Sequence, residues 1–141
     1  MAQQQPTFAK TALITGSTGG IGSELATRLH GLAYRLLLVD MDDARLKAQA
    51  GKLAGAEIHV VDMRDGAAVA AFCKRVIAGG TSIDVAVINA GMLVIGDLAN
   101  ITPEDLRAQI TVNLCSAAAL AQALAGRMRE ERRGHSLATV G

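Results

Sequence analysis

Short apolar runs alternate along the chain with segments whose hydrophobic residues recur at helical spacing. Residues 11–15 form the first apolar run, and a cluster of glycines ends it. Ile21, Leu25 and Leu29 then recur at the spacing of one helix face. Further short runs predict four more strands, at residues 35–39, 57–61, 83–88 and 136–140. The stretches between them predict helices at residues 44–53, 66–77 and about 102–128.

Capping residues mark the expected ends of two of these helices. The glycine pair at residues 79–80 follows the helix expected at residues 66–77 and suits a C-terminal cap. Thr102 and Pro103 open the last helix, because threonine caps a helix and proline occupies its first turn. Asp105 can reach back to that cap.

The alternation of strands and helices predicts the fold class. Strand–helix–strand units with short connections form right-handed crossovers and therefore a parallel sheet. The strands are apolar at consecutive positions, as in VAVI at residues 85–88, so helices should cover both faces of the sheet. We expect a single α/β layer domain without repeats or linkers.

Composition and charge narrow the classes of function. A chain of 141 residues with 50% hydrophobic content suits one globular domain. A net charge of +1 leaves no basic surface that would favour nucleic acid. The N-terminus lacks the apolar stretch of a signal peptide, and no apolar run approaches the roughly 18 residues of a membrane span. We therefore expect a cytoplasmic protein with neither a nucleic-acid nor a membrane partner.

Cysteines and histidines give no sign of a metal or a disulfide. Cys73 and Cys115 lie in apolar helical surroundings without a CxxC partner, so we expect reduced thiols in the core. His30, His59 and His135 fall in three different elements and lack the spacing of metal ligands. No metal site is expected.

The strongest chemical signal is the glycine loop TGSTGGIG at residues 15–22, which follows the first strand and opens into a helix. Glycines let the backbone turn tightly and approach a pyrophosphate, while free N–H groups at a helix start face negative charge. The loop lacks the Gly-Lys-Ser/Thr ending of a nucleotide-hydrolysing P-loop. A plain turn with purely structural glycines stays the alternative.

Asp40 adds a second signal at the end of the second strand. It lies 18 residues beyond Gly22, where an acid can bind a ribose 2′-hydroxyl. The alternative is a solvated carboxylate at a strand end.

These motifs and three later ones together resemble the short-chain dehydrogenase/reductase family over about residues 8–141. The later motifs are Asp62-Met63, Asn89-Ala90-Gly91 and Asn113. The glycine loop fits both family forms, TGxxxGxG and TGxxGxxG, and the Asn89-Ala90-Gly91 turn favours the shorter first form. The resemblance implies a Rossmann-type doubly wound parallel sheet with about five strands present and its C-terminal part incomplete. Residues 1–9 would be an N-terminal extension and residues 10–141 the dinucleotide-binding domain.

The resemblance also implies roles for individual residues. Those of the glycine loop would shape the pyrophosphate site: Gly16, Ser17, Thr18, Gly20, Ile21 and Gly22. Asp62 and Met63 would contact the adenine ring, and Asn89, Ala90 and Gly91 would support the sheet and line the nicotinamide-side ribose. Asp62 could instead cap the following helix, and Asn89 and Gly91 could simply form a turn.

Asp40 sets the expected cofactor. By the resemblance it would hold the adenosine ribose hydroxyls, which favours NAD over NADP because a carboxylate repels a 2′-phosphate. No arginine is expected to replace it nearby.

The expected activity is interconversion of an alcohol and a carbonyl by hydride transfer, which requires a proton donor. The family uses a Tyr-x-x-x-Lys pair and a serine, but the single tyrosine, Tyr34, has Leu38 four positions later. By the register of the last strand the serine would fall at or after residue 141. By the resemblance Asn113 would join the proton relay. An amide in an apolar helix is costly unless it is hydrogen-bonded, which favours this role over the alternative of an exposed position.

We therefore expect the chain to be the cofactor-binding half of an NAD(P)-dependent oxidoreductase, inactive alone. In family oligomers a helix matching residues 111–124 forms part of the subunit contact, so homo-oligomers are expected only for a full-length form. The alanine-rich surface of that helix and the fifth strand should be exposed here. The alternative function is a non-catalytic dinucleotide-binding or interaction module.

Overall fold

The computed structural model describes residues 7–138 and contains one five-stranded sheet. Its strands are β1 (Lys10–Thr15), β2 (Tyr34–Asp40), β3 (Glu57–Val60), β4 (Val85–Ile88) and β5 (His135–Ala138). Every pairing is parallel, and the spatial order is β3-β2-β1-β4-β5. The chain moves outward from β1 to β3 and then returns to the other side of β1, so the strand order reverses between β1 and β4.

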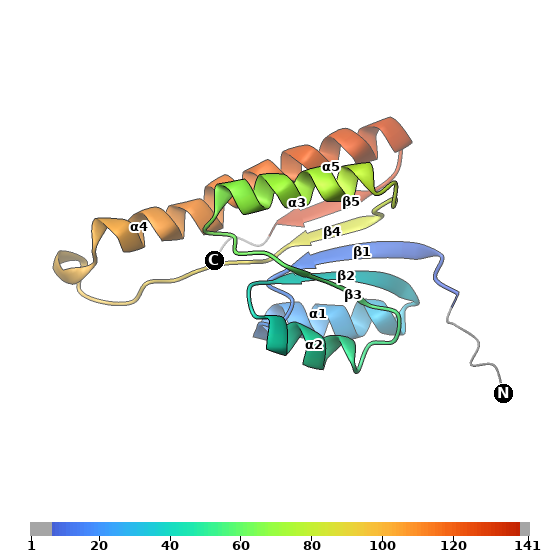
Figure 1. The fold of residues 1–141 in the computed structure, drawn as a ribbon, viewed down its shortest axis with the longest axis horizontal. Helices are drawn as coiled ribbons and strands as arrows, with labels where there is room; N and C mark the ends of the chain where they lie inside the picture. Colours follow the sequence, from blue (N-terminus) through green and yellow to red (C-terminus); the bar gives the residue numbers. More distant parts are fainter. Residues whose placement is uncertain (1–6, 139–141) are drawn as a thin grey trace.

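Helices cover both faces of this sheet, as predicted (Figure 1). On one face lie α1 (Gly20–Gly31) and α2 (Asp43–Ala50); on the other lie α3 (Gly66–Ala78) and α5 (Ala117–Glu131). A short 3₁₀ turn, η1 (Leu98–Asn100), and α4 (Pro103–Ile110) extend beyond the carboxyl ends of the strands. The result is a doubly wound sheet of the Rossmann type.

The core consists of two apolar clusters, one on each side of the sheet. Leu13 of β1 packs toward α3 and α5 with Phe72 and Leu120. Its neighbours in β1, Ala12 and Ile14, pack in the other cluster, toward α1 and α2. Because successive strand residues point to opposite faces, a strand buried on both sides is apolar at consecutive positions.

The predicted element boundaries hold to within a few residues. The helix expected at residues 44–53 runs from Asp43 to Ala50, because Asp42 caps it by accepting a hydrogen bond from the Arg45 N–H at 3.0 Å. The expected cap of α4 is confirmed: Thr102 Oγ1 accepts from the Asp105 N–H at 3.1 Å, and the Asp105 carboxylate reaches back to accept from the Thr102 hydroxyl at 2.8 Å. The fifth strand begins one residue early, at His135, and residues 139–140 lie outside the described part of the chain.

The last predicted helix is not one continuous α-helix. A π-helical segment, η2 (Thr111–Ser116), joins α4 to α5. The whole helical run, Pro103–Glu131, is long and apolar enough by composition to cross a membrane. In the structure 22% of its most apolar 18-residue stretch is buried. Val112, Leu120 and Leu124 lie in the core cluster with Phe72 of α3.

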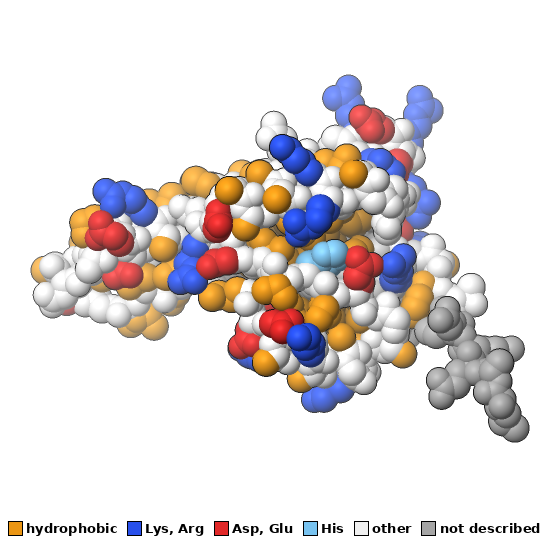
Figure 2. Space-filling model, viewed as in Figure 1, with side chains coloured by type: hydrophobic (Ala, Val, Ile, Leu, Met, Phe, Trp, Pro, Cys, Tyr) orange, Lys and Arg blue, Asp and Glu red, His pale blue; other side chains and the backbone are white. Residues whose placement is uncertain are grey.

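The exposed apolar surface differs in part from the prediction. The fifth strand is exposed, as expected. Of the alanines at residues 117–123, several pack against the core instead: Ala117, Ala121 and Ala123. The exposed large hydrophobic side chains on this run are Leu106, Ile110 and Leu114, four residues apart. Figure 2 shows hydrophobic side chains interspersed with charged ones on the part of the molecule that projects beyond the sheet.

The two cysteines also differ from each other. Cys73 is buried, as predicted, and burial raises the pKa of its thiol. Cys115 is exposed, so the expectation that it is a core thiol is wrong. It lies in η2, where the neighbouring Ser116 rather than Cys115 faces the core and donates its hydroxyl to the Met63 carbonyl oxygen at 2.7 Å.

Candidate cofactor site

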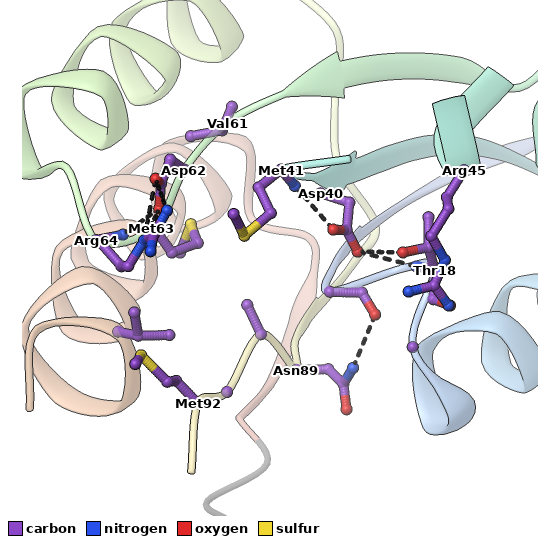
Figure 3. A pocket seen from close by; sticks show the side chains of 15 residues that line it. Thr18, Asp40, Met41, Arg45, Val61, Asp62, Met63, Arg64, Asn89 and Met92 are labelled. Carbon is purple, nitrogen blue, oxygen red and sulfur yellow. Dashed lines mark hydrogen bonds and ion pairs between the residues drawn. The ribbon is translucent and has the colours of Figure 1, made fainter. Parts of the chain in front are cut away.

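A cavity of about 460 Å³ opens at the carboxyl ends of β1, β2 and β4, beside the point where the strand order reverses. Ligands of doubly wound sheets bind at this place. Eight of the residues predicted from the sequence line it: Gly16, Thr18, Asp40, Asp62, Met63, Asn89, Ala90 and Gly91. Others were not predicted: Gly19, Met41, Arg45, Val61, Arg64, Met92 and Val112. Figure 3 shows how the longer of these side chains surround the cavity.

Two glycines of the loop are required by the backbone itself. Gly16 has φ +62°, and a Cβ there would lie 2.9 Å from the Ala90 Cα. A Cβ on Gly22 would lie 2.1 Å from the Gly16 carbonyl oxygen, so α1 can pack against the loop only with glycine at that position. A Cβ on Gly20 would meet no atom within 4 Å. The structural alternative therefore accounts for Gly16 and Gly22 but not for Gly20.

The start of α1 differs from the other α-helix starts that follow a loop. Asp42, Asp65 and Thr102 cap α2, α3 and α4 with side-chain hydrogen bonds. The N-cap of α1 is Gly19, which has no side chain to donate or accept, and Gly19 lines the cavity. The first N–H groups of a helix lack intrahelical partners and carry partial positive charge. This end of the cavity is therefore suited to a phosphate group.

Asp40 is tied to the glycine loop. Its Oδ2 accepts hydrogen bonds from the Thr18 N–H at 3.1 Å and the Thr18 hydroxyl at 2.8 Å, and its Oδ1 accepts from the Met41 N–H at 2.8 Å (Figure 3). The alternative of a merely solvated strand-end carboxylate is thus wrong. The carboxylate stabilises the loop and still borders the cavity.

An arginine lies close to Asp40, contrary to the expectation from the sequence. Arg45 borders the same cavity and donates from Nη2 to the Thr18 carbonyl oxygen at 2.7 Å. The expectation was wrong because the first turn of α2 brings Arg45 back over the loop, which spacing along the chain does not reveal. Asp40 and Arg45 therefore both bind Thr18.

Asp62 binds Arg64 rather than the start of the next helix. Hydrogen bonds from the Arg64 side chain hold the pKa of the Asp62 carboxyl below its usual value, against a smaller effect of burial. The cap of α3 is Asp65, which accepts hydrogen bonds from the Ala67 and Ala68 N–H groups. Asp62 is therefore not a capping residue, and it borders the cavity beside the buried Met63.

Asn89 joins the end of β4 to the end of β1. Its Nδ2 donates to the carbonyl oxygens of Thr15 and Gly16, both at 3.3 Å. The buried Thr15 hydroxyl accepts in return from the N–H groups of Asn89 and Ala90, both at 3.0 Å. Asn89 thus holds the start of the glycine loop, at Gly16, in addition to forming a turn.

Asn113 lies in η2 and binds one residue of the β4–α4 loop. Its Oδ1 accepts from the Met92 N–H and its Nδ2 donates to the Met92 carbonyl oxygen, both at 2.8 Å. Asn113 does not itself line the cavity, whereas Met92 does. Its place in a proton relay stays a prediction.

The other residues predicted from the glycine loop do not line the cavity. Ser17 is fully buried beneath the loop, and the Ile21 side chain is 64% exposed. Ser17, Gly20, Ile21 and Gly22 are not among the lining residues. For residues 7–138, no group of three or more His, Cys, Asp or Glu side chains could hold a metal ion.

The fold and the cavity together define a class of protein, because a glycine loop and a strand-end carboxylate at the switch point are typical of dinucleotide-binding α/β domains. The family model described as short chain dehydrogenase matches residues 10–140. The chain therefore belongs to the short-chain dehydrogenase family.

A curated relative supports this assignment. The uncharacterized short-chain type dehydrogenase/reductase y4eK of Sinorhizobium fredii is 33% identical over 127 residues, which are 89% of this chain and 49% of that protein. The chain spans about half the length of the curated relatives it matches, such as this one.

Solved structures show the same fold. The bulky-bulky ketone specific alcohol dehydrogenase from Comamonas testosteroni superposes with a TM-score of 0.87 at 27% identity, over 94% of this chain and 55% of that one. A metagenomic short-chain oxidoreductase in complex with NADP superposes with a TM-score of 0.81 at 32% identity, over 93% and 61% of the two chains.

Proposed function

We propose that the cavity binds NAD in preference to NADP, as the cofactor site of an oxidoreductase that interconverts an alcohol and a carbonyl in its full-length form. The observation that carries this proposal is the uncapped start of α1, held by a glycine loop next to Asp40 at one cavity. Anionic pyrophosphate suits the N–H groups, and ribose hydroxyls suit the carboxylate.

Each part of the cavity has a proposed role. The loop and the start of α1 form the pyrophosphate site, which Gly16, Gly20 and Gly22 shape, with Ser17, Thr18 and Ile21 as neighbouring residues. Asp40 accepts hydrogen bonds from the adenosine ribose. Asp62 and Met63 contact the adenine ring, and Asn89, Ala90 and Gly91 line the nicotinamide-side ribose.

The preference for NAD rests on the charge of Asp40. A 2′-phosphate would be placed near this carboxylate, and like charges at short range repel. Arg45 opposes this effect, and the metagenomic relative was solved with NADP. We propose that Asp40 dominates, because Thr18 holds its carboxylate at the border of the cavity by two hydrogen bonds.

The bound nicotinamide would supply or accept the hydride. This chain's own residues bind and orient the cofactor, and Asn113 holds Met92 at the cavity wall. The sequence contains no Tyr-x-x-x-Lys pair. We therefore propose that residues 1–141 bind the cofactor without transferring hydride.

Titration calorimetry of the purified chain tests the proposal. We expect binding of NADH with higher affinity than NADPH and no turnover of alcohols or ketones. A folded chain that binds neither dinucleotide would disprove cofactor binding and would favour the alternative in which the glycines of the loop are purely structural. Binding of NADH by a monodisperse, cooperatively folding chain would favour a self-sufficient, non-catalytic module. Turnover would show that the acid–base groups lie elsewhere than expected.

The proposed cellular setting is the cytoplasm, with a small alcohol or carbonyl as the substrate of a full-length form. No nucleic-acid or membrane partner is proposed, and homo-oligomers are proposed only for the full-length protein. Cell fractionation and size-exclusion chromatography with light scattering test these points.

A further inference from the structure

Helix α2 binds the glycine loop through two side chains one turn apart. Gln49 Nε2 donates to the Ser17 carbonyl oxygen at 2.7 Å, and the Ser17 hydroxyl donates to Gln49 Oε1 at 3.1 Å. Arg45 Nη2 donates to the Thr18 carbonyl oxygen at 2.7 Å. The carbonyl groups of two consecutive loop residues therefore both accept hydrogen bonds from side chains of α2. No sequence motif predicted either hydrogen bond.

Ser17 makes the Gln49 contact costly to lose. Its side chain is fully buried, and its N–H donates to the Val39 carbonyl oxygen at 3.2 Å. Gln49 uses both ends of its amide on this one residue. A buried polar group without a partner is expensive, so the loop keeps this conformation as long as Gln49 is present.

The orientation of these carbonyl groups matters for an anionic ligand. A carbonyl oxygen that rotated into the cavity would face the phosphates with its negative end. Gln49 lies outside the main cavity, in the adjoining groove of about 310 Å³ that it borders with Thr18, Arg45 and Lys52. A Ser17 carbonyl held by Gln49 is therefore directed to α2, which leaves the positive start of α1 to face the ligand.

We propose that Gln49, assisted by Arg45, is a positioning residue that keeps the glycine loop in its pyrophosphate-binding conformation. This inference rests on the proposed function and adds a determinant outside the cavity. A loop ordered before binding loses less entropy when the ligand arrives, so affinity for the pyrophosphate depends on α2.

The test compares two ligands on the full chain. ADP-ribose carries the pyrophosphate, whereas adenosine carries only the adenine and the ribose that Asp40 would bind. For Gln49→Met, which keeps the length of the side chain and removes both polar contacts, we expect ADP-ribose to bind about tenfold more weakly by calorimetry. Adenosine binding, followed by ligand-observed NMR, should not change.

Lys52→Met is the matched control, because Lys52 borders the same groove and, among the described residues, has no hydrogen bond to the loop. It should leave the affinity of both ligands unchanged. Gln49→Asn retains the amide but is one methylene shorter, so it should weaken ADP-ribose binding selectively with little effect on packing. It provides the same test if Gln49→Met folds poorly.

Equal weakening of adenosine and ADP-ribose, or unchanged ADP-ribose binding in both Gln49 variants, would overturn the positioning role while leaving the proposed function intact. If the wild-type chain binds neither ADP-ribose nor NADH, the proposed function fails and this inference fails with it.

Discussion

Asn113 binds both the N–H and the carbonyl oxygen of Met92, and it does so from a π-helical turn. The π-turn adds a residue to the helix and changes which side chains face inward. In this turn Asn113 reaches the β4–α4 loop, while the Leu114 side chain is 64% exposed. Segments of π-helix often occur at functional sites, and here the turn anchors a loop that borders the cavity.

Replacing Asn113 should loosen this loop. For Asn113→Leu we expect a loss of about 1–3 kcal/mol in the free energy of unfolding, because two backbone groups lose their partner. Urea unfolding measures the loss, and amide hydrogen exchange should rise at Met92. Leu114→Gln in the same turn is the control and should change stability by less than about 0.5 kcal/mol, since the side chain is exposed. Equal effects of the two changes would contradict the anchoring role.

The charge of Asp40 should set the cofactor preference. Asp40→Asn keeps an oxygen that can accept from Thr18 but removes the negative charge facing a 2′-phosphate. We expect the ratio of NAD to NADP affinity to fall at least about tenfold, which corresponds to about 1.4 kcal/mol. Asp40→Ala should relax discrimination as well and also weaken NAD, because the Thr18 contacts are lost. Calorimetric titration with both cofactors measures the ratio, and an unchanged ratio would show that Asp40 does not discriminate.

Much of this site follows from the sequence because it depends on the ends of strands. Strands that run parallel have their carboxyl ends at the same end of the sheet. Because β1 pairs in parallel with both β2 and β4, Gly16, Asp40 and Asn89 come to one cavity. The glycine at position 22 has a structural reason as well, because a Cβ there would lie 2.1 Å from the Gly16 oxygen.

The contacts made by helices were harder to predict. Arg45 and Gln49 reach the loop only because the Asp42 cap sets where α2 begins and how it is rotated over β2. The amino-acid composition of η2 does not distinguish a π-helical turn from an α-helix. Its position coincides with the tertiary contact between Asn113 and Met92, which local sequence does not contain.

Protonation of His59 should destabilise the fold as the pH falls. Burial lowers the pKa of this histidine below 6.5, the nearby Arg75 lowers it further, and Glu57 opposes both. The unfolded chain therefore takes up a proton at higher pH than the folded chain, so stability is lost as the pH falls below about 6.5. NMR titration of the His59 ring should give a pKa below 6.5, and a value above it would contradict this environment. His59→Gln should flatten the pH dependence in this range.

Asp84 should contribute stability that disappears in acid. Burial alone would raise the pKa of its carboxyl, but hydrogen bonds from the Thr11 N–H, at 2.8 Å, and from Arg133 hold it below 3.8. Because the folded pKa lies below the unfolded one, this stability is fully present above the unfolded value and is lost as the pH falls through the folded value. Asp84→Leu should cost about 1–3 kcal/mol at neutral pH by leaving the Thr11 N–H unpaired. Asp84→Asn, which retains an acceptor, should cost less; urea unfolding at several pH values distinguishes the two.

Substitution by alanine should have opposite effects on stability at Gly20 and at Gly22. In Gly22→Ala the new Cβ would lie 2.1 Å from a backbone oxygen, so we expect a loss of at least about 1–3 kcal/mol or failure to fold.

In Gly20→Ala the Cβ meets no atom within 4 Å, and the chain should be as stable or gain about 0.4–1 kcal/mol. If the open space over Gly20 is where a pyrophosphate approaches, this stable variant should nevertheless bind NADH at least about tenfold more weakly. Thermal unfolding and calorimetry on the same sample separate the two effects. Unchanged NADH affinity in a folded Gly20→Ala chain would place the pyrophosphate away from this turn, and destabilisation would mean that the glycine is structural, as at Gly22.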